Sequence, residues 1–210
     1  MRAATLCLML LLAWPAVAVE RVVSLAPSLT EIMLELDAGD LLVGLLDGGE
    51  RPPAVAQLPS VGRYGQLELE SLLQLQPDLV LLWPDSIGSA QRQQLQRLGI
   101  PLLIVEPRKL ADLAKNFVEI GTRVGRAEQG RQLQRKFNAG LAELRRRYRR
   151  EQPLALFYQL WDVPLYTIGG QQIISDALGV CGAENIFAEL ALPAPQVSVE
   201  AVLERNPEVI

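Results

Sequence analysis

Between residue 21 and about residue 110, short aliphatic runs alternate with segments of helical pattern, and this rhythm limits the possible folds most strongly. The runs RVVSLA, LLVGLL, PDLVLLW and PLLIVE are almost continuously apolar, which is typical of strands buried on both faces of a parallel sheet. The helical segments between them supply the crossovers that parallel strands require. The sequence therefore predicts an α/β lobe with a mainly parallel sheet covered by helices on both faces.

The first helical segment, PSLTEIMLELD, has a local start signal. Ser28 is followed three residues later by Glu31, and a serine cap paired with an acid at this spacing forms a capping box. We therefore expect the Ser28 side chain to cap this helix.

Near residue 110 the pattern changes, because two helical segments follow each other with no strand between them. At about 1.5 Å per residue, the second segment (127–149) forms a rod of about 35 Å. Strand and helix patterns then resume in LALFYQ, LYTIGG and IISDALGVCG. The sequence thus predicts lobes at 19–125 and 151–210, joined by a rigid helix within 126–150. The helix carries an apolar stripe at the spacing of one face: Leu133, Phe137, Leu141, Leu144 and Tyr148.

The N-terminus has the layout of a secretory signal peptide. A single positive charge at Arg2 precedes an apolar run that is too short to span a bilayer, and Ala16 and Ala18 form an A-x-A-like cleavage site. A membrane anchor or a buried helix is the alternative. We expect residues 1–18 to be removed and the mature protein to be exported to the periplasm, with Cys181 as its one remaining cysteine.

Composition narrows the function. The formal net charge is −4 and the chain has no histidine. An acidic, exported protein is a poor partner for nucleic acid. Without histidine, His-based catalytic triads and the commonest transition-metal ligand are both absent, so we expect no metal site. An exported enzyme that works with carboxylates such as Asp47, Glu50 and Asp162 is the alternative from another functional class.

One phrase occurs twice in the chain. Residues 70–80 read ESLLQLQPDLV and residues 200–210 read EAVLERNPEVI; both have Glu first, Leu three places later, Pro at seven and an acid at eight. In the first copy the proline ends a helix and leads into the buried strand 79–83. The second copy predicts the same arrangement, but the chain stops after three strand residues. We therefore expect the second lobe to continue past residue 210, where a partner for Cys181 would lie.

A ligand cleft between two lobes is lined by loops at strand ends, where aromatic and polar groups meet. Tyr64 lies in the glycine-flanked loop GRYGQ, Trp83 ends a strand, and Trp161 and Tyr166 flank the turn DVP. Each of these four is a candidate ligand contact, with a core or rim aromatic as the alternative. Arg51 and Arg63 also lie near the expected mouth. They are candidates for an anionic ligand, or ordinary surface arginines.

These features together resemble the helical-backbone substrate-binding proteins of bacterial ABC importers. The likeness is carried by RVVSLAPSLTE, LELESLLQLQPDLVLLW, LGIPLLIVE and VCGAENIF…PAPQVSVEAVLERNPEVI, and runs from about Arg21 to the last residue. Within the family it is greatest to the members that bind cobalamin. The resemblance implies a monomer that holds one ligand between its lobes, does no chemistry and then docks on a transmembrane permease.

The resemblance also implies residue roles. The docking glutamates of the family fall on Glu70 and Glu200, each of which would meet arginines of one permease subunit. Tyr64, Trp83 and Tyr166 fall where ring-contacting aromatics bind the corrinoid. With no histidine in the chain, the protein would not coordinate the cobalt.

Two departures from the cobalamin-binding members affect this picture. Gly48 and Ala194 stand where those members have aromatic residues. The ligand could therefore be a related corrinoid instead of cobalamin. A protein of the same architecture that binds a ferric siderophore or haem is the other alternative.

Overall fold

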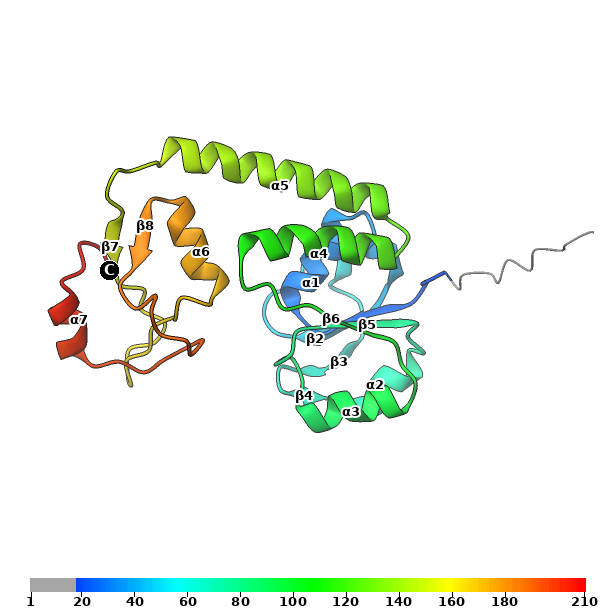
Figure 1. The fold of residues 1–210 in the computed structure, drawn as a ribbon. Helices are drawn as coiled ribbons and strands as arrows, with labels where there is room; N and C mark the ends of the chain where they lie inside the picture. The colour runs from blue at the N-terminus through cyan, green and yellow to red at the C-terminus, as the bar shows by residue number, and fades with distance from the viewer. Residues whose placement is uncertain (1–17) are drawn as a thin grey trace, which may run out of the picture.

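The computed structural model describes residues 18–210 (Figure 1). The predicted signal peptide, residues 1–18, lies outside the described residues except for Ala18. Two α/β lobes are joined by one long helix, as the sequence predicted. Within the described part of the chain, no helix is both long and apolar enough to cross a membrane.

The first lobe is built on a six-stranded sheet. Its strands are β1 Val22–Ser24, β2 Leu42–Asp47, β3 Ser60–Arg63, β4 Gln66–Leu67, β5 Leu79–Leu82 and β6 Leu102–Ile104. Their order is β4–β3–β2–β1–β5–β6. All neighbouring pairs are parallel except β3–β4, which form an antiparallel hairpin at one edge. The central strands β1 and β5 are buried along their whole length, which explains why they are apolar except for Ser24 at the end of β1.

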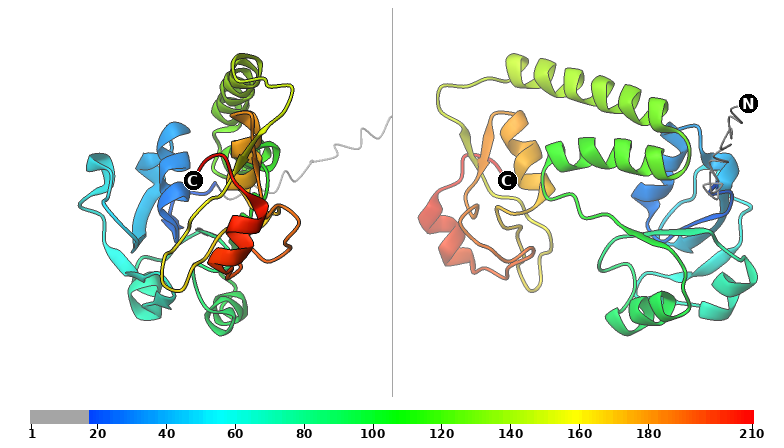
Figure 2. Two further views of the ribbon diagram at one scale, coloured as in Figure 1. Left: turned by 90° about the vertical axis from the view of Figure 1, so that its left-hand side faces the viewer. Right: turned by 45° about the vertical axis from the view of Figure 1, so that its right-hand side comes forward.

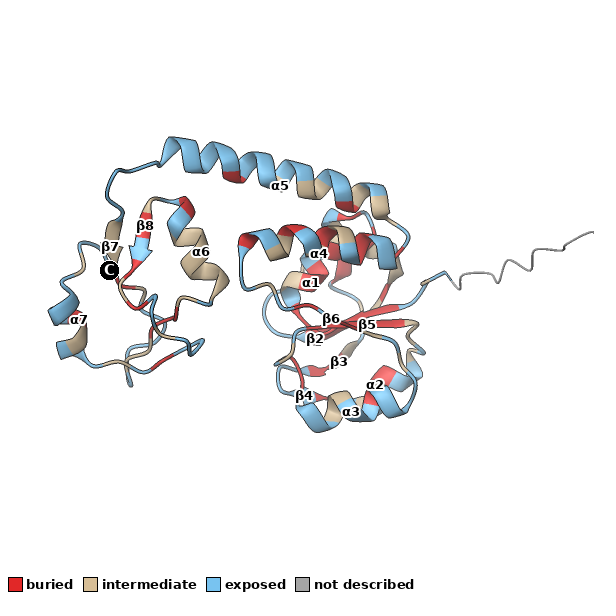
Figure 3. Cartoon of the chain, viewed as in Figure 1, coloured by how far each residue is buried: buried red, intermediate tan, exposed pale blue. Residues whose placement is uncertain are grey.

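Helices cover both faces of this sheet. The helices of the lobe are α1 Pro27–Glu35, α2 Leu69–Gln74, α3 Ser89–Arg97 and α4 Leu110–Arg123, with short 3-10 turns at Gly39–Leu41 and Pro53–Val55. Figure 1 shows α1 and α4 above the sheet and α2 and α3 below it. Side chains of successive strand residues pack on opposite faces of the sheet. Val22 and Leu81 pack toward α1 and α4, whereas Val23 and Val80 pack toward α2 and α3. Figure 3 shows these buried residues concentrated in the sheet and on the inner helix faces.

The predicted capping box at Ser28 is wrong. Helix α1 begins at Pro27, two residues earlier than a cap at Ser28 would give, and its cap residue Ala26 is extended and makes no side-chain cap. Proline suits this position because its fixed φ matches the helix and its missing N–H needs no partner there. The Ser28 hydroxyl is buried and has no hydrogen-bond partner within the described residues.

The connecting helix α5 spans Ala127–Arg147, two residues shorter than the predicted 127–149. It runs antiparallel to α4 and then reaches across to the second lobe (Figure 1). Phe137 meets Phe117 of α4 edge-on, with ring centroids 5.3 Å apart. The later part of the predicted stripe is less buried, since Leu144 and Tyr148 are 39% and 41% exposed. The helix therefore leaves the first core before its apolar stripe ends.

Two glycines allow the close crossing of α4 and α5. A Cβ atom on Gly130 would lie 2.5 Å from the Phe117 carbonyl oxygen and 3.1 Å from the Val118 Cα atom. A Cβ atom on Gly121 would lie 2.7 Å from the Arg126 carbonyl oxygen. These neighbours are backbone atoms, which cannot rotate away as a side chain can. The two helix axes must therefore separate if either glycine gains a side chain.

We expect Gly130→Ala to lower the free energy of unfolding by about 2–3 kcal/mol, because the added methyl group overpacks a backbone-to-backbone contact. Gly140, on the same helix, has no atom within 4 Å of its would-be Cβ. Gly140→Ala should therefore raise the free energy of unfolding by up to about 1 kcal/mol, since alanine favours the helix. Urea unfolding of both variants measures the two effects. Equal stability in the two variants would contradict the packing argument.

The second lobe is smaller in the described chain. Strands β7 Leu154–Leu156 and β8 Ala183–Asn185 pair in parallel, and helices α6 Ile173–Val180 and α7 Val199–Arg205 pack beside them. Val209 forms a parallel bridge with Leu156, so the segment after α7 begins to extend the same sheet. The core contains Phe157, Phe187 and Val202, with the two phenylalanine rings edge-on at 5.9 Å.

The predicted strand LYTIGG, residues 165–170, is not a strand. Only Tyr166 in this stretch forms isolated bridges, to Trp161 and to Gln196. Gly169 and Gly170 are approached closely by the backbone of residues 188–192. The chain folds back on itself here, which leaves no edge available for regular strand pairing.

Candidate functional site

The two copies of the repeated phrase fold into the same local structure. Glu70 and Glu200 are each the second residue of their helix, α2 and α7. After each helix comes a residue with left-handed backbone, Gln76 and Asn206, each with φ of 46°. A proline follows in both cases and directs the chain into the next extended segment. The repeat in the sequence is therefore a repeat in the structure.

The acid at the eighth place of the phrase has a role that the sequence did not reveal. Asp78 Oδ2 accepts the backbone N–H of Arg21 at 3.0 Å, and Glu208 Oε2 accepts the backbone N–H of Ala155 at 2.9 Å. Arg21 lies just before β1, and Ala155 lies in β7. In both lobes the carboxylate therefore ties the segment after the proline to the neighbouring strand.

Both leading glutamates are exposed to solvent. Neither forms an ion pair with another of the residues that the structure describes. A carboxylate in the first turn of a helix is favoured by the helix dipole. A hydrogen bond from its own backbone N–H, with a further one from Ser198, lowers the pKa of Glu200. The Glu200 carboxylate is therefore charged at neutral pH and free to meet a cation.

The two helices that carry these glutamates face the same side of the molecule. Figure 1 shows α2 in the first lobe and α7 in the second, both away from the connecting helix α5, and the two views of Figure 2 agree. A single partner on that side of the molecule could therefore reach both helices.

A cleft of about 600 Å³ lies between the lobes. The first lobe lines it with residues that follow the carboxyl ends of its strands: Tyr64 after β3, Trp83 after β5 and Val105 after β6. The second lobe contributes Ile173 and Pro193, among others. Ligands of open α/β sheets bind beyond the carboxyl ends of the strands, so the cleft has the expected position for a ligand site.

Two of the four predicted aromatic residues line the cleft. Tyr64, 63% exposed, occupies the tip of the β3–β4 hairpin, and Trp83 is 38% exposed. Buried Ser86 holds both segments, because its carbonyl oxygen accepts the Gly65 N–H at 3.0 Å and its hydroxyl accepts the Trp83 N–H at 3.1 Å. The two rings are thus carried on backbone segments that are tied together.

The other two aromatic residues lie outside the cleft lining. The Trp161 indole N–H donates to the Val163 carbonyl oxygen at 3.1 Å, and Tyr166 exchanges backbone hydrogen bonds with Trp161. They form a small hairpin of the second lobe. Their role as ligand contacts stays a prediction. Gly48 and Ala194 also lie outside the lining.

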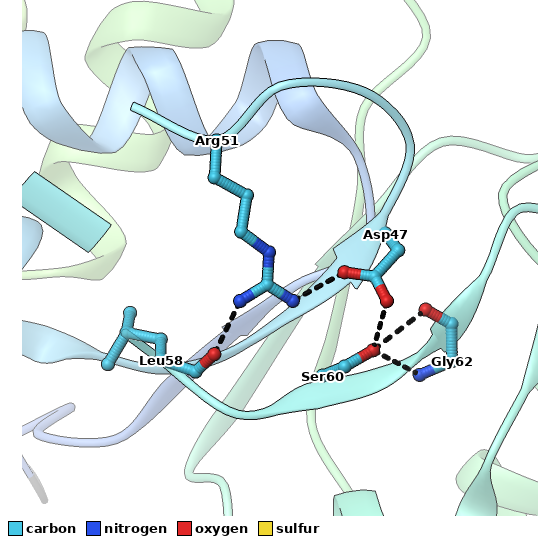
Figure 4. Close-up of polar contacts among 5 residues, drawn as sticks. All are labelled: Asp47, Arg51, Leu58, Ser60 and Gly62. Atoms are coloured by element: carbon cyan, nitrogen blue, oxygen red, sulfur yellow. Dashed lines mark hydrogen bonds and ion pairs between the residues drawn. The ribbon is translucent and has the colours of Figure 1, made fainter. Parts of the chain in front are cut away.

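The two arginines considered for an anionic ligand do not line the cleft either. Arg51 donates to the Leu58 carbonyl oxygen and to Asp47 Oδ1, both at 2.5 Å (Figure 4). Asp47 also accepts the Ser60 hydroxyl at 2.6 Å. The Ser60 hydrogen bond, and then the Arg51 contact, lower the pKa of Asp47. This network fixes the loop after β2. Arg63 donates to Gln66 Oε1 at 2.8 Å.

The carboxylates proposed for an enzyme do not come together. Asp47 is held in the Arg51 network, and Glu50 is exposed on the same loop. Asp162 lies in the second lobe and accepts the Val163 N–H at 2.9 Å. None of the three lines the cleft. In residues 18–210, no group of three or more Cys, Asp or Glu side chains is placed to hold a metal ion.

The cleft contains one cationic side chain that the sequence reasoning missed. Arg108 follows β6 in the loop before α4; it donates to Glu106 at 3.0 Å and reaches Gln171 of the second lobe at 3.5 Å. Asp85 and Glu106 also line the cleft, so the charged groups of its lining sum to −1 (one cation, two anions). The strand-end rule that pointed to Trp83 would have found Arg108 as well.

A second contact between the lobes lies near this arginine. Asp176 of α6 accepts the backbone N–H of Leu110, the first residue of α4, at 2.8 Å. Leu110, Leu141 and Val180 form a buried apolar cluster beside it. A carboxylate of one lobe thus caps a helix of the other, which restrains the lobes next to the cleft.

Cys181 is an exposed free thiol at the end of α6. Its disulfide to a residue past 210 stays a prediction.

Two α/β lobes joined by a rigid helix, with a cleft between them, define a ligand-binding protein, and residues 22–210 match the family model of periplasmic binding proteins. The chain belongs to this family. A vitamin B12-binding protein of Yersinia pestis (strain Pestoides F) is 37% identical over 209 residues, which cover 100% of this chain and 75% of that protein.

Solved structures agree with this assignment. The crystal structure of the periplasmic vitamin B12-binding protein BtuF of Vibrio cholerae superposes with a TM-score of 0.81 at 33% identity, covering 90% of this chain and 74% of that one. The periplasmic haem-binding protein HutB of Vibrio cholerae, at 23% identity and a TM-score of 0.79, covers 90% and 74% respectively and shares the fold.

Proposed function

We propose that this protein is the periplasmic substrate-binding component of an ABC importer. It captures cobalamin or a related corrinoid in the inter-lobe cleft and delivers it to the transmembrane permease. The observation that carries the proposal is the pairing of one cleft with two helices on the same side of the molecule that each have glutamate as their second residue. The relatives that are named for vitamin B12 binding support the choice of ligand.

The chemistry of the cleft favours a corrinoid over an anionic ligand. Tyr64 and Trp83 offer aromatic faces, which bury apolar area of a large ring at little entropic cost. The charged groups of the lining sum to −1, which disfavours the carboxylates of haem or of an anionic siderophore. With no histidine in the chain, contact is made by shape and hydrogen bonds, and the cobalt keeps its own ligands.

Arg108 is the one observation in favour of a different ligand. Arg108 lines the cleft, and its guanidinium could pair with a carboxylate of haem or of a ferric siderophore. This guanidinium already forms an ion pair with Glu106 in the structure, so a carboxylate of the ligand would have to displace Glu106. We therefore rank this ligand class second.

Delivery requires docking, and Glu70 and Glu200 are the groups we assign to it. Each would pair with arginines of one permease subunit, because a fixed carboxylate and a guanidinium form short, charge-assisted hydrogen bonds. The protein would act as an exported monomer, without a cofactor and without catalysing a reaction.

Calorimetric titration tests the ligand class. Cyanocobalamin, haem and a ferric hydroxamate siderophore are each titrated into the purified protein. We expect saturable heat with cyanocobalamin and none with the other two. Tight binding of haem or of the siderophore, with no heat from cyanocobalamin, would overturn the corrinoid assignment and support the Arg108 alternative.

A further inference from the structure

The repeated phrase contains a second exposed residue besides its glutamate. In each copy the residue two places after the glutamate is buried: Leu72 is 0% exposed and Val202 is 8% exposed. The leucine three places after the glutamate is not buried. Leu73 is 40% exposed and Leu203 is 71% exposed, and neither belongs to a packed apolar cluster of its lobe.

The fold itself does not explain these leucines. The core of each lobe needs the apolar residue two places after the glutamate. The proline and the acid later in the phrase fix the extended segment that follows the helix. A leucine that faces solvent contributes little to stability, yet leucine stands at this place in both lobes. A large apolar side chain repeated at an exposed position indicates a contact with another molecule.

The position of each leucine on its helix links it to the glutamate. Residues three apart lie next to each other on one helix face, so Leu73 lies one turn after Glu70, and Leu203 one turn after Glu200. We call Glu70 with Leu73 the first docking patch, and Glu200 with Leu203 the second docking patch. The helices that carry the two patches, α2 and α7, both lie on the side of the molecule away from α5 (Figure 1).

We propose that Leu73 and Leu203 are contact residues for the permease, and that each docking patch fits an arginine flanked by an apolar pocket. The proposal rests on the proposed function and adds the chemistry of the partner surface. Two patches of the same composition and helix geometry fit a partner with two equivalent sites, as a homodimeric membrane protein has. In each docking patch the carboxylate steers and orients the encounter with the permease. The leucine becomes buried only when the complex forms, and this burial slows dissociation.

The test measures docking directly. Variants Leu73→Ser and Leu203→Ser, alone and together, are captured on a surface, and the cognate permease in nanodiscs is passed over them. Leu144→Ser is the matched control, because Leu144 is 39% exposed but lies on α5, on the opposite side. Cyanocobalamin affinity is measured in parallel, since neither leucine lines the cleft.

We expect each substitution to weaken permease binding about tenfold, and the pair about a hundredfold, mainly through faster dissociation. The loss should persist in about 0.5 M salt, where exposed ion pairs are screened. Cyanocobalamin affinity and the Leu144→Ser control should stay at the level of the unmodified protein.

Two other outcomes separate this proposal from the proposed function. If the double leucine variant binds the permease within twofold of the unmodified protein, the leucine contacts are wrong while the docking function stands. If the unmodified protein itself does not bind the permease, the proposed function is wrong, and the leucine proposal falls with it.

Discussion

Replacing Tyr64 and Trp83 together with alanine weakens cyanocobalamin binding several hundredfold. Each ring lines the cleft and is carried on a segment that Ser86 holds in place. An aromatic contact of this kind contributes about 2 kcal/mol when truncated, and about 4 kcal/mol for the pair corresponds to several hundredfold in affinity. Isothermal titration of the double variant against the unmodified protein measures the change.

Tyr148→Ala is the control for this prediction. Tyr148 is 41% exposed, close to the exposure of Trp83, but it lies at the end of α5 and outside the cleft lining. Its replacement should leave cyanocobalamin affinity within about twofold. A double variant that keeps full affinity would show that the ligand binds elsewhere. Trp161→Ala, measured beside it, decides whether the second-lobe hairpin takes part in binding.

The parallel sheet of the first lobe could be predicted because its strands are buried on both faces. β5 is apolar at every position and β1 at all but Ser24, and such runs have few other structural solutions. The edge hairpin β3–β4 was not predicted, because its short strands contain glycine and polar residues and lie at the edge of the sheet. Strand β8 was missed for a similar reason: it is three residues long and contains Glu184.

Local patterns failed where tertiary contacts decide the backbone. Residues 165–170 have the composition of a strand, but the backbone of residues 188–192 crosses Gly169 and Gly170. That approach depends on a segment about 20 residues further along the chain, so no local window contains it. The same limit applies to the local structure around Trp161 and Tyr166, whose role as ligand contacts stays a prediction. Their hairpin folds on itself, and this is a property of the fold rather than of spacing.

The repeated local structure around Glu70 and Glu200 was the most predictable part of the molecule, because its sequence occurs twice in the chain. The repeat located both glutamates, and the structure shows that its other positions place the helix and the next segment. The contacts that Arg108 and Asp176 make between the lobes were missed, because the relative position of two lobes cannot be read from one sequence. The polar groups that join the lobes are therefore the part of this site that only a structure supplies.

Changing both Glu70 and Glu200 to arginine abolishes permease-dependent uptake while cyanocobalamin affinity stays unchanged. Each reversal removes a charge-assisted contact and places two cations face to face, at a cost of about 2–5 kcal/mol per site. Two such sites together lower permease affinity by more than about a thousandfold. Ligand affinity is preserved because neither glutamate lines the cleft. Uptake of labelled cyanocobalamin into permease proteoliposomes is the measurement.

A control with the same change in net charge is Glu35→Arg with Glu151→Arg. Both residues are exposed, one in each lobe, and neither lies on α2 or α7. This pair should leave uptake near the level of the unmodified protein, because overall charge is not what the permease recognises. Normal uptake by the Glu70 and Glu200 double variant would remove the docking assignment. Restored uptake after reversing the facing arginines of the permease would establish the pairing directly, since only a specific contact can be rescued by exchanging its two charges.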